Sequence, residues 1–239
     1  MRVIGVIPAR MGSSRFPGKP LVSIGGTPMI EHVYRGTAGS RLLDEVIIAT
    51  SDPEIAAAAA AFGARSVMTS AAHDRASDRV AEVSAGDDAG IVVMVQGDEP
   101  MVTPAMVDAT VRALTADPAI ACVNLSAPIA DELEARDPNT IKVVTSRDGR
   151  ALYFSRSMIP GAYVPQALHK QVCVIAFRRQ ALLQFSTLPR GPLEEIESID
   201  MLRFLENGIP VCMVPTGVKT HAVDTETDLE RVSRLMGFA

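Results

Sequence analysis

Residues 1–20, MRVIGVIPARMGSSRFPGKP, carry the strongest local signal for the fold of this chain. It opens with an apolar run at residues 3–7, whose length and β-branched content are typical of a buried strand. Beyond that run lie three cations, two glycines and two small hydroxyls. Ligands of open α/β sheets bind beyond the carboxyl ends of the strands, and glycines there let backbone N–H groups turn inward. The stretch therefore predicts a loop that binds a polyanion.

This loop differs from the Walker phosphate-binding loop. Five residues separate Gly12 from Gly18, and Pro20 follows Lys19 where the Walker motif has Ser or Thr. Pro17 and Pro20 also prevent a helix from starting directly behind the loop. A triphosphate would therefore be held by side chains and a stiff loop more than by a helix dipole. The alternative interpretation is a solvated basic turn at the surface.

The composition is that of an ordinary globular protein. With 239 residues, of which 47% are hydrophobic and 21% charged, the chain can bury a full core. It lacks an apolar run of the roughly 18 residues that span a membrane, and Pro8 and Arg10 come too early for a signal peptide. A net charge of −5 argues against nucleic-acid binding, and three scattered cysteines predict reduced thiols. We expect a cytoplasmic protein with neither a nucleic-acid nor a membrane partner.

Strand-like and helix-like segments alternate through the first half of the chain. Apolar strand-like runs occur at residues 46–49, 66–68, 91–95 and 120–124, and helices are expected to begin at the caps Thr27, Asp52 and Thr103 and after the loop at 69–79. This alternation predicts right-handed βαβ units and a mostly parallel sheet. The expected fold class is α/β, a Rossmann-like three-layer sandwich.

The pattern changes after residue 137. Residues 141–144 and 151–154 flank an Asp-Gly turn and predict an antiparallel hairpin inserted at 138–160. The remaining segments predict a strand at 172–177, one helix at 193–206, a strand at 210–214 and a terminal helix at 225–236. We expect one domain, residues 1–239, that carries the inserted hairpin.

Two acidic residues lie where a metal ion would be useful. Asp98 follows the strand at 91–95, so it leaves the sheet at the edge that carries the basic loop, and Asp224 lies between a strand and the last helix. Mg²⁺ prefers one or two carboxylates together with phosphate oxygens and water. The alternatives are a solvated or helix-capping role for Asp98 and a place at a helix N-terminus for Asp224, where an acid is favourable.

Four motifs, in this order and spacing, carry a family resemblance. Residues 7–21 resemble the signature loop of the sugar-acid cytidylyltransferases, and among them the 3-deoxy-manno-octulosonate (Kdo) cytidylyltransferases, or CMP-Kdo synthetases. The resemblance continues through residues 95–100, 151–157 and 223–225. It implies a nucleotidyltransferase fold, a homodimer, Mg²⁺ held by Asp98 and Asp224, and a hairpin at 138–160 that contributes to the dimer interface and the sugar site.

The resemblance also implies a reaction and a set of site residues. A hydroxyl of Kdo would attack the α-phosphate of CTP and pyrophosphate would leave, in the synthesis of cell-surface lipopolysaccharide. Catalysis would come from positioning and charge neutralisation. We expect catalytic roles for Arg10, Lys19 and Asp98. Nucleotide contacts are expected from Ala9, Arg10, Ser13, Lys19, Ser70, Arg79 and Gln96, and acceptor contacts from Arg156, Gln171, Glu194 and Met201.

The acceptor side departs from the family pattern. Residues 170–173 read Lys-Gln-Val-Cys instead of Lys-His-Ile-Gly, and residues 199–203 read Ile-Asp-Met-Leu-Arg instead of Leu-Glu-Gln-Leu-Arg. Gln171 cannot carry a proton as histidine can, and Met201 cannot bind a hydroxyl as glutamine can. Kdo is the default acceptor. The alternatives are a related acid such as an amino-substituted octulosonate, a phosphorylated sugar, alditol or phosphonate, or a nucleotide-binding protein without catalysis. His169 and His221 are expected at the surface.

Overall fold

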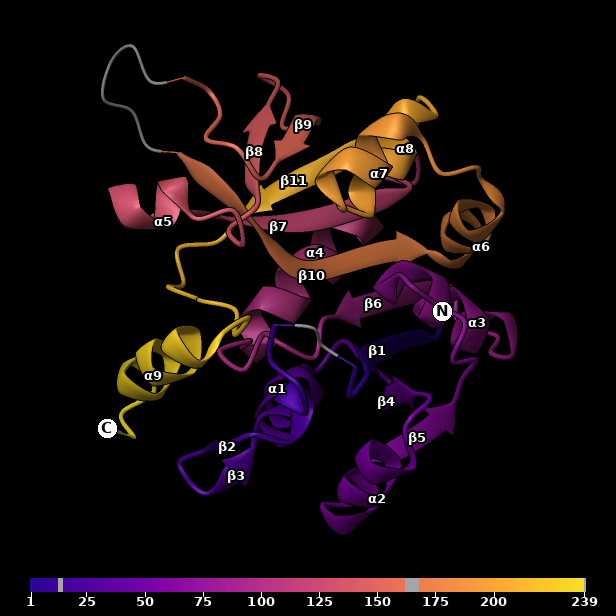
Figure 1. The fold of residues 1–239 in the computed structure, drawn as a ribbon. Helices are drawn as coiled ribbons and strands as arrows, with labels where there is room; N and C mark the ends of the chain where they lie inside the picture. The colour runs from indigo at the N-terminus through magenta and orange to yellow at the C-terminus, as the bar shows by residue number, and fades with distance from the viewer. Residues whose placement is uncertain (13–14, 162–167, 239) are drawn as a thin grey trace.

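The structure is a computed structural model, which describes residues 1–12, 15–161 and 168–238 (Figure 1). Its described strands build a sheet with the central order β11-β7-β10-β6-β1-β4-β5. The bounds of these strands are β1 Val3–Ala9, β4 Glu45–Thr50, β5 Arg65–Met68, β6 Ile91–Val95, β7 Cys122–Pro128, β10 His169–Arg178 and β11 Val211–Pro215. β1 pairs in parallel with β4 and β6, β4 with β5, and β11 with β7. Among the described strands of this central order, β10 alone is antiparallel to its neighbours, β6 and β7. The sheet is therefore mostly parallel, as predicted.

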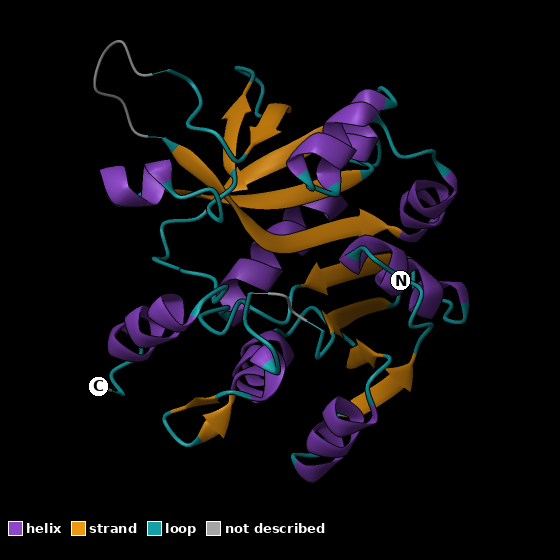
Figure 2. Cartoon of the chain, in the orientation of Figure 1, coloured by secondary structure: helices purple, strands orange, loops and turns teal. Residues whose placement is uncertain are grey.

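Helices cover both faces of this sheet and complete the three layers (Figure 2). Side chains of α1 (Met29–Ala38), α2 (Pro53–Ala61) and α4 (Pro104–Ala116) pack with Val3 and Ile7 of β1 on one face. Side chains of α3 (Ala76–Ala85), α6 (Arg179–Thr187) and α8 (Met201–Glu206) pack with Ile4 and Val6 on the other. Successive residues of a strand point to opposite faces, which is why the β1 run is apolar throughout. The predicted fold class is confirmed.

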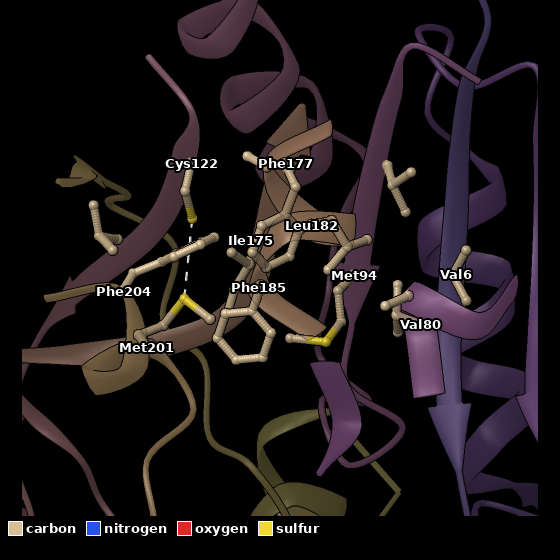
Figure 3. Packing of buried hydrophobic residues seen from close by; sticks show 14 of the residues in the cluster. Val6, Val80, Met94, Cys122, Ile175, Phe177, Leu182, Phe185, Met201 and Phe204 are labelled. Atoms are coloured by element: carbon tan, nitrogen blue, oxygen red, sulfur yellow. Dashed lines mark hydrogen bonds between the residues drawn. The ribbon is translucent and has the colours of Figure 1, made fainter. Parts of the chain in front are cut away.

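The second of these cores packs aromatic, aliphatic and sulfur-containing side chains together (Figure 3). Phe185 and Phe204 meet edge to face with ring centroids 5.0 Å apart. The thiol of Cys122 points at the sulfur of Met201, 4.0 Å away. Met201 is therefore part of a packed apolar wall formed by α8 and β7.

The predicted hairpin is present. β8 (Lys142–Thr145) and β9 (Ala151–Ser155) pair antiparallel, and Gly149 in their turn has φ +82°, a conformation that glycine adopts without strain. β8 also pairs with the first residues of β10, and Met213 of β11 donates its backbone N–H to the carbonyl of Gly149 at 2.8 Å. The hairpin is thus attached to the sheet at two places.

Several sequence predictions were wrong in detail. The predicted helix at 193–206 is two helices, α7 (Pro192–Glu197) and α8, because Ser198 between them has φ +54°. Thr27 does not cap α1, because β3 (Thr27–Pro28) pairs instead with β2 (Ser23–Ile24). The strand predicted at 120–124 runs from Cys122 to Pro128. The predicted loop 69–79 ends at Arg75, so Arg79 lies in α3. The helices α5 (Glu132–Arg136) and α6 were not predicted.

The chain ends in α9 (Glu226–Leu235), which begins with a capping box. Thr225 Oγ1 accepts the N–H of Asp228, and the Asp228 carboxylate accepts the N–H of Thr225. A short 3₁₀ turn (Lys19–Leu21) follows the opening loop, and Gly18 before it has φ +72°. Among the residues that the structure describes, none of the helices has both the length and the apolar character to cross a membrane.

Candidate active site

Two cavities meet at the carboxyl edge of the sheet. The larger has a volume of about 740 Å³ and is lined by the opening loop, the start of α3 and residues 96–98. The smaller, about 170 Å³, lies between β10, α8 and residues 220–228. The residues that line both are Arg15, Gln96, Asp98, Asn139, Arg156, Ser198 and Asp224. A molecule in one cavity would therefore touch a molecule in the other near Asp98 and Asp224.

A lysine joins the two acids at this junction. Lys19 Nζ lies 2.8 Å from Asp98 Oδ2 and 3.0 Å from Asp224 Oδ1. Burial disfavours the charged ammonium, but the two carboxylates outweigh it and raise the pKa of Lys19. Arg15 Nη2 also contacts Asp224 Oδ1, at 2.9 Å. The side chains of Asp98 and Asp224 thus converge on one point rather than facing different surfaces.

The strands and loops behind the junction explain this convergence. Asp98 follows β6 and Asp224 precedes α9, and the backbone N–H of Val223 donates to the carbonyl of Asp98 at 2.9 Å. A Cβ on Gly97 would lie 3.0 Å from the carbonyl of Pro8, so glycine allows the loop after β6 to approach the end of β1 closely.

Four cationic residues line the larger cavity besides Arg15 and Arg156, namely Arg10, Lys19, Arg75 and Arg79. Arg79 is only 3% exposed, and its Nη1 donates to Thr69 Oγ1. Burial lowers the pKa of Arg79, Asp52 opposes this shift, and Arg10 adds to it through charge repulsion. Two guanidinium groups that repel each other in a cavity are stabilised when a polyanion binds between them.

The first turn of α3 is held against α8 by two acid contacts, and this places Arg79 in the cavity. Ser77 donates its N–H and hydroxyl to Asp200 Oδ2, at 3.1 and 2.8 Å. Asp78 accepts from Arg203 Nη1 at 2.9 Å. Helix α3, which carries Arg79, and helix α8, which carries Met201, are therefore linked through buried polar contacts.

Arg156 lies at the boundary of the two cavities. Its Nε donates to the carbonyl of Glu197 at 2.5 Å, Nη1 to that of Pro138 at 2.9 Å and Nη2 to that of Ser198 at 3.2 Å. Each terminal nitrogen keeps a second N–H group, which suits a two-pronged contact to a carboxylate. Its own carbonyl accepts from the buried Lys142 Nζ at 2.5 Å, so the backbone here is also held.

The smaller cavity has a polar and an apolar wall. Met94, Ile175, Ile199 and Met201 form the apolar part, and Met201 is fully buried in the protein. Gln171 faces the cavity from β10, and its Nε2 donates to Asn124 Oδ1 at 2.6 Å. Asn124 Nδ2 donates in turn to the carbonyl of Val172 at 2.7 Å, which fixes the orientation of the Asn124 amide.

Sequence comparisons place the chain among known proteins. The model of the cytidylyltransferase family matches residues 4–216. A 3-deoxy-manno-octulosonate cytidylyltransferase of Geobacter metallireducens is 44% identical over 97% of this chain and 96% of its own length. One of Solibacter usitatus is 46% identical over 98% of this chain and 94% of its own length. This chain belongs to the 3-deoxy-manno-octulosonate cytidylyltransferase family.

Structural comparisons agree with this assignment to the Kdo cytidylyltransferase family. The chain is similar to a CMP:2-keto-3-deoxy-manno-octonic acid synthetase solved in complex with CTP, with 40% identity, a TM-score of 0.91, and coverage of 99% of this chain and 98% of the other. A cytidylyltransferase of Leptospira borgpetersenii, 18% identical with a TM-score of 0.68 over 100% of this chain and 88% of the other, shares the fold. The resemblance noted in the sequence is confirmed, and the protein is a nucleotidyltransferase.

Most residues predicted for this Kdo cytidylyltransferase family site line one of the cavities. Ala9, Arg10, Lys19 and Arg79 line the larger, Gln171 and Met201 the smaller, and Gln96, Asp98, Arg156 and Asp224 both. Ser70 does not line either cavity in the described structure: its hydroxyl accepts the N–H of Ala72 and its own N–H donates to Glu82. Ser13 lies outside the described residues.

Glu194 is a second predicted site residue that lines neither of the two cavities. It is fully buried, and its Oε1 and Oε2 each accept from Arg203, at 2.7 Å. Arg203 in turn stacks 4.1 Å above the ring of Phe185. Glu194 therefore acts as the counter-ion of a buried arginine that holds α7 to α8, and its contact with the acceptor stays a prediction.

The sequence prediction missed several polar residues of the smaller cavity. The cavity is also lined by Glu99, Lys170 and His221, all of them buried, although His221 was predicted at the surface. Burial raises the pKa of Glu99 to about 7. The place of Glu99 directly after Asp98 was a usable signal, whereas His221 follows a stretch that has no secondary structure.

A Mg²⁺ ion fits the junction by the chemistry of its donors. Within the described ranges, no cluster of three or more acidic, histidine or cysteine side chains could hold a metal by itself. Asp98 and Asp224 nevertheless both contact one Lys19 ammonium, so they lie close enough to share a cation. Two carboxylates completed by phosphate oxygens and water are the ligand set that Mg²⁺ prefers, so this pair suits an ion that arrives with a nucleotide.

Proposed function

We propose that this protein transfers CMP from CTP to Kdo and releases pyrophosphate. One observation carries the proposal: a cationic cavity large enough for a nucleotide adjoins a smaller cavity, and Asp98, Asp224 and Arg156 line both. The relatives named above support the choice of substrates, because they are Kdo cytidylyltransferases and one was solved with CTP.

The triphosphate of CTP is bound in the larger cavity by Arg10, Lys19 and Arg79. The sugar acid is bound in the smaller cavity, with its carboxylate on the free N–H groups of Arg156. Its hydroxyl oxygen forms a bond to the α-phosphorus while the bond between that phosphorus and the bridging oxygen breaks. Pyrophosphate leaves with the electron pair of that bond, and the hydroxyl proton is lost to solvent.

The catalytic contribution of the chain is positioning and charge neutralisation. Lys19 and Arg10 offset the charge that develops on the bridging and leaving oxygens. Asp98 and Asp224 hold Mg²⁺, which when bound neutralises phosphate charge and orients the phosphates. The apolar wall around Met201 excludes water, which would otherwise compete with the sugar hydroxyl.

The setting of this function is also proposed. The product, a CMP-activated sugar acid, is the donor needed to build lipopolysaccharide, a synthesis that begins from cytoplasmic nucleotides. The proposed protein is a homodimer that uses the hairpin at 138–160, as the family resemblance implies.

A panel of acceptors tests the proposal. Pyrophosphate release would be measured with CTP, Mg²⁺ and either Kdo, an amino-substituted analogue of Kdo, another ulosonate, or a sugar 1-phosphate. We expect turnover with Kdo. Turnover with the amino analogue alone would show that the acceptor is another sugar acid of the same class. This analogue is included because Gln171 and Met201 depart from the family pattern. Turnover only with the sugar 1-phosphate, or CTP binding without pyrophosphate release from any acceptor, would refute the proposal.

A further inference from the structure

The segment that carries Asp224 is held by a cluster of buried charges. The cluster consists of Glu134 in α5, Lys170 in β10, His221 in the segment itself and Asp228 in α9. Their side chains are only 2%, 9%, 8% and 13% exposed, in that order. Groups of this kind are costly to bury unless each is paired, so their arrangement is constrained.

His221 links the two acids of the cluster. Its Nε2 lies 2.8 Å from Asp228 Oδ1, and its Nδ1 lies 3.4 Å from Glu134 Oε1. Lys170 Nζ contacts the same Glu134 oxygen at 2.5 Å and donates to the carbonyl of Thr220 at 2.6 Å. The histidine therefore fills the position between α5 and α9, and the residue before it is held as well.

Asp228 connects this cluster to the backbone of Asp224. While its Oδ1 faces His221, its Oδ2 accepts the backbone N–H of Asp224 at 3.1 Å, the N–H of Thr225 at 2.9 Å and the Thr225 hydroxyl at 2.8 Å. A carboxylate bound on both oxygens has a fixed plane. The main chain of Asp224 is thus held from the α9 side by Asp228, while the neighbouring Val223 is held by the carbonyl of Asp98.

We propose that His221 is a positioning residue that acts through Asp228 to hold Asp224 in register with Asp98 for a shared divalent cation. This inference rests on the proposed role of the two acids in binding the metal. His221 does not need to touch substrate or metal for this role. Residues that orient metal ligands without contacting the metal themselves typically change metal affinity or activity by about 10–100-fold when they are removed.

A purely structural role for His221 makes a different prediction. In that case its removal would lower the melting temperature but leave the metal affinity of the folded protein unchanged. The hydrogen bond from the backbone N–H of Asp224 to Asp228 favours the positioning role, because it connects the cluster directly to the main chain of the proposed metal ligand. Metal affinity is therefore the decisive measurement.

The experiment compares full-length wild type with His221→Gln and with the matched control His32→Gln. His32 lies in α1, where its Nε2 contacts the carbonyl of Ile24 at 2.9 Å, and it does not line either of the two described cavities. Mn²⁺ is titrated into each protein with CTP and without acceptor, and free Mn²⁺ is read by electron paramagnetic resonance. Binding of CTP is measured separately in chelator, and thermal unfolding reports the fold.

We expect His221→Gln to weaken Mn²⁺ binding by about tenfold, to leave metal-free CTP binding unchanged, and to raise the Mg²⁺ concentration for half-maximal activity more than it lowers kcat. His32→Gln is expected to match wild type. Wild-type Mn²⁺ affinity in folded His221→Gln would overturn the inference. If that variant does not fold, Asp228→Asn takes its place, with the same expected loss and the same overturning result. Failure of wild type to bind Mn²⁺ would refute the proposed metal site itself.

Discussion

Asp98 and Asp224, which lie far apart in the sequence, are held on the same Lys19 ammonium at 2.8 and 3.0 Å. One acid follows the central strand β6 and the other precedes the last helix, α9. Only the folded sheet brings them together. The pair marks the point where the two cavities meet.

Replacing the ammonium should affect the rate more than the fold. We expect Lys19→Met to lower kcat by about 100- to 1000-fold, since charge stabilisation of this kind contributes on that scale. The melting temperature should fall by only a few degrees, because Lys19 follows a loop and its partners are partly solvated. Pyrophosphate release at saturating CTP and thermal unfolding measure the two effects. A melting temperature that collapsed with the activity would contradict the catalytic role.

The two acids should behave as one site in a double-mutant cycle. Asp98→Asn and Asp224→Asn are each expected to raise the Mg²⁺ concentration for half-maximal activity by at least about tenfold. The double variant should be little worse than either single variant, because residues that share one ligand are not additive. Titration of activity with Mg²⁺ checks this. Fully additive effects would mean that the acids do not share an ion.

Arg79 should contribute to binding of CTP at some cost to the free protein. It is buried near Arg10, so Arg79→Met removes a repulsion that is relieved only by an anion. We expect the KM for CTP to rise by about tenfold. The melting temperature without nucleotide should stay the same or rise, while its increase on adding CTP should shrink. A lower melting temperature with an unchanged KM would show that Arg79 is structural.

Arg203 should matter for stability because it is the only described counter-ion within 3 Å of the fully buried Glu194. We expect Arg203→Met to lower the free energy of unfolding by about 3–5 kcal/mol, since the buried carboxylate would keep Arg75 as a counter-ion only at the longer distance of 3.5 Å. Arg136→Met is the control, because Arg136 and Glu132 form a pair on α5 in which both side chains are exposed. Its effect should be below about 0.5 kcal/mol. Denaturant unfolding would measure both, and equal effects would contradict this account.

The pH dependence of stability should reflect His221. Burial disfavours its charged form, but Asp228 and Glu134 outweigh burial and raise its pKa to about 9 from 6.5. A raised pKa means that the folded state binds the proton more tightly, so this stabilisation is complete below pH 6.5 and is lost as the pH rises to 9. We expect a loss on the order of 2 kcal/mol in wild type. Denaturant unfolding between pH 6 and 10 would show a flatter profile for His221→Gln; identical profiles would contradict the assignment.

Much of the fold could be predicted because the relevant signals are local. The run at 3–7 is apolar at each position, and it became β1 with both faces covered. The Asp-Gly turn before residue 150 predicted the hairpin, and the turn glycine does adopt positive φ. The helix predicted at 193–206 failed at Ser198, because its periodic apolar pattern continues across a residue whose left-handed conformation no local signal indicated.

The candidate site was predicted less evenly. Residues on the opening loop and after β6 line the cavities as expected, since the carboxyl ends of neighbouring parallel strands share one edge. The burial of His221 and the pairing of Glu194 with Arg203 were not predicted, because whether a charged side chain faces a cavity, solvent or a buried partner depends on residues distant in sequence. Arg203 decides the position of Glu194, and Asp228 with Glu134 decides that of His221.

The class of the fold and the family follow from the amino-acid sequence without the structure, since both depend on residue types at short spacing. The meeting of Asp98 and Asp224 on Lys19 is a property of the folded chain. The tertiary structure alone also showed that a buried cluster around His221 stands behind Asp224. Electrostatic contacts act over a few ångströms of space, and the chain reaches that proximity only after the sheet has assembled.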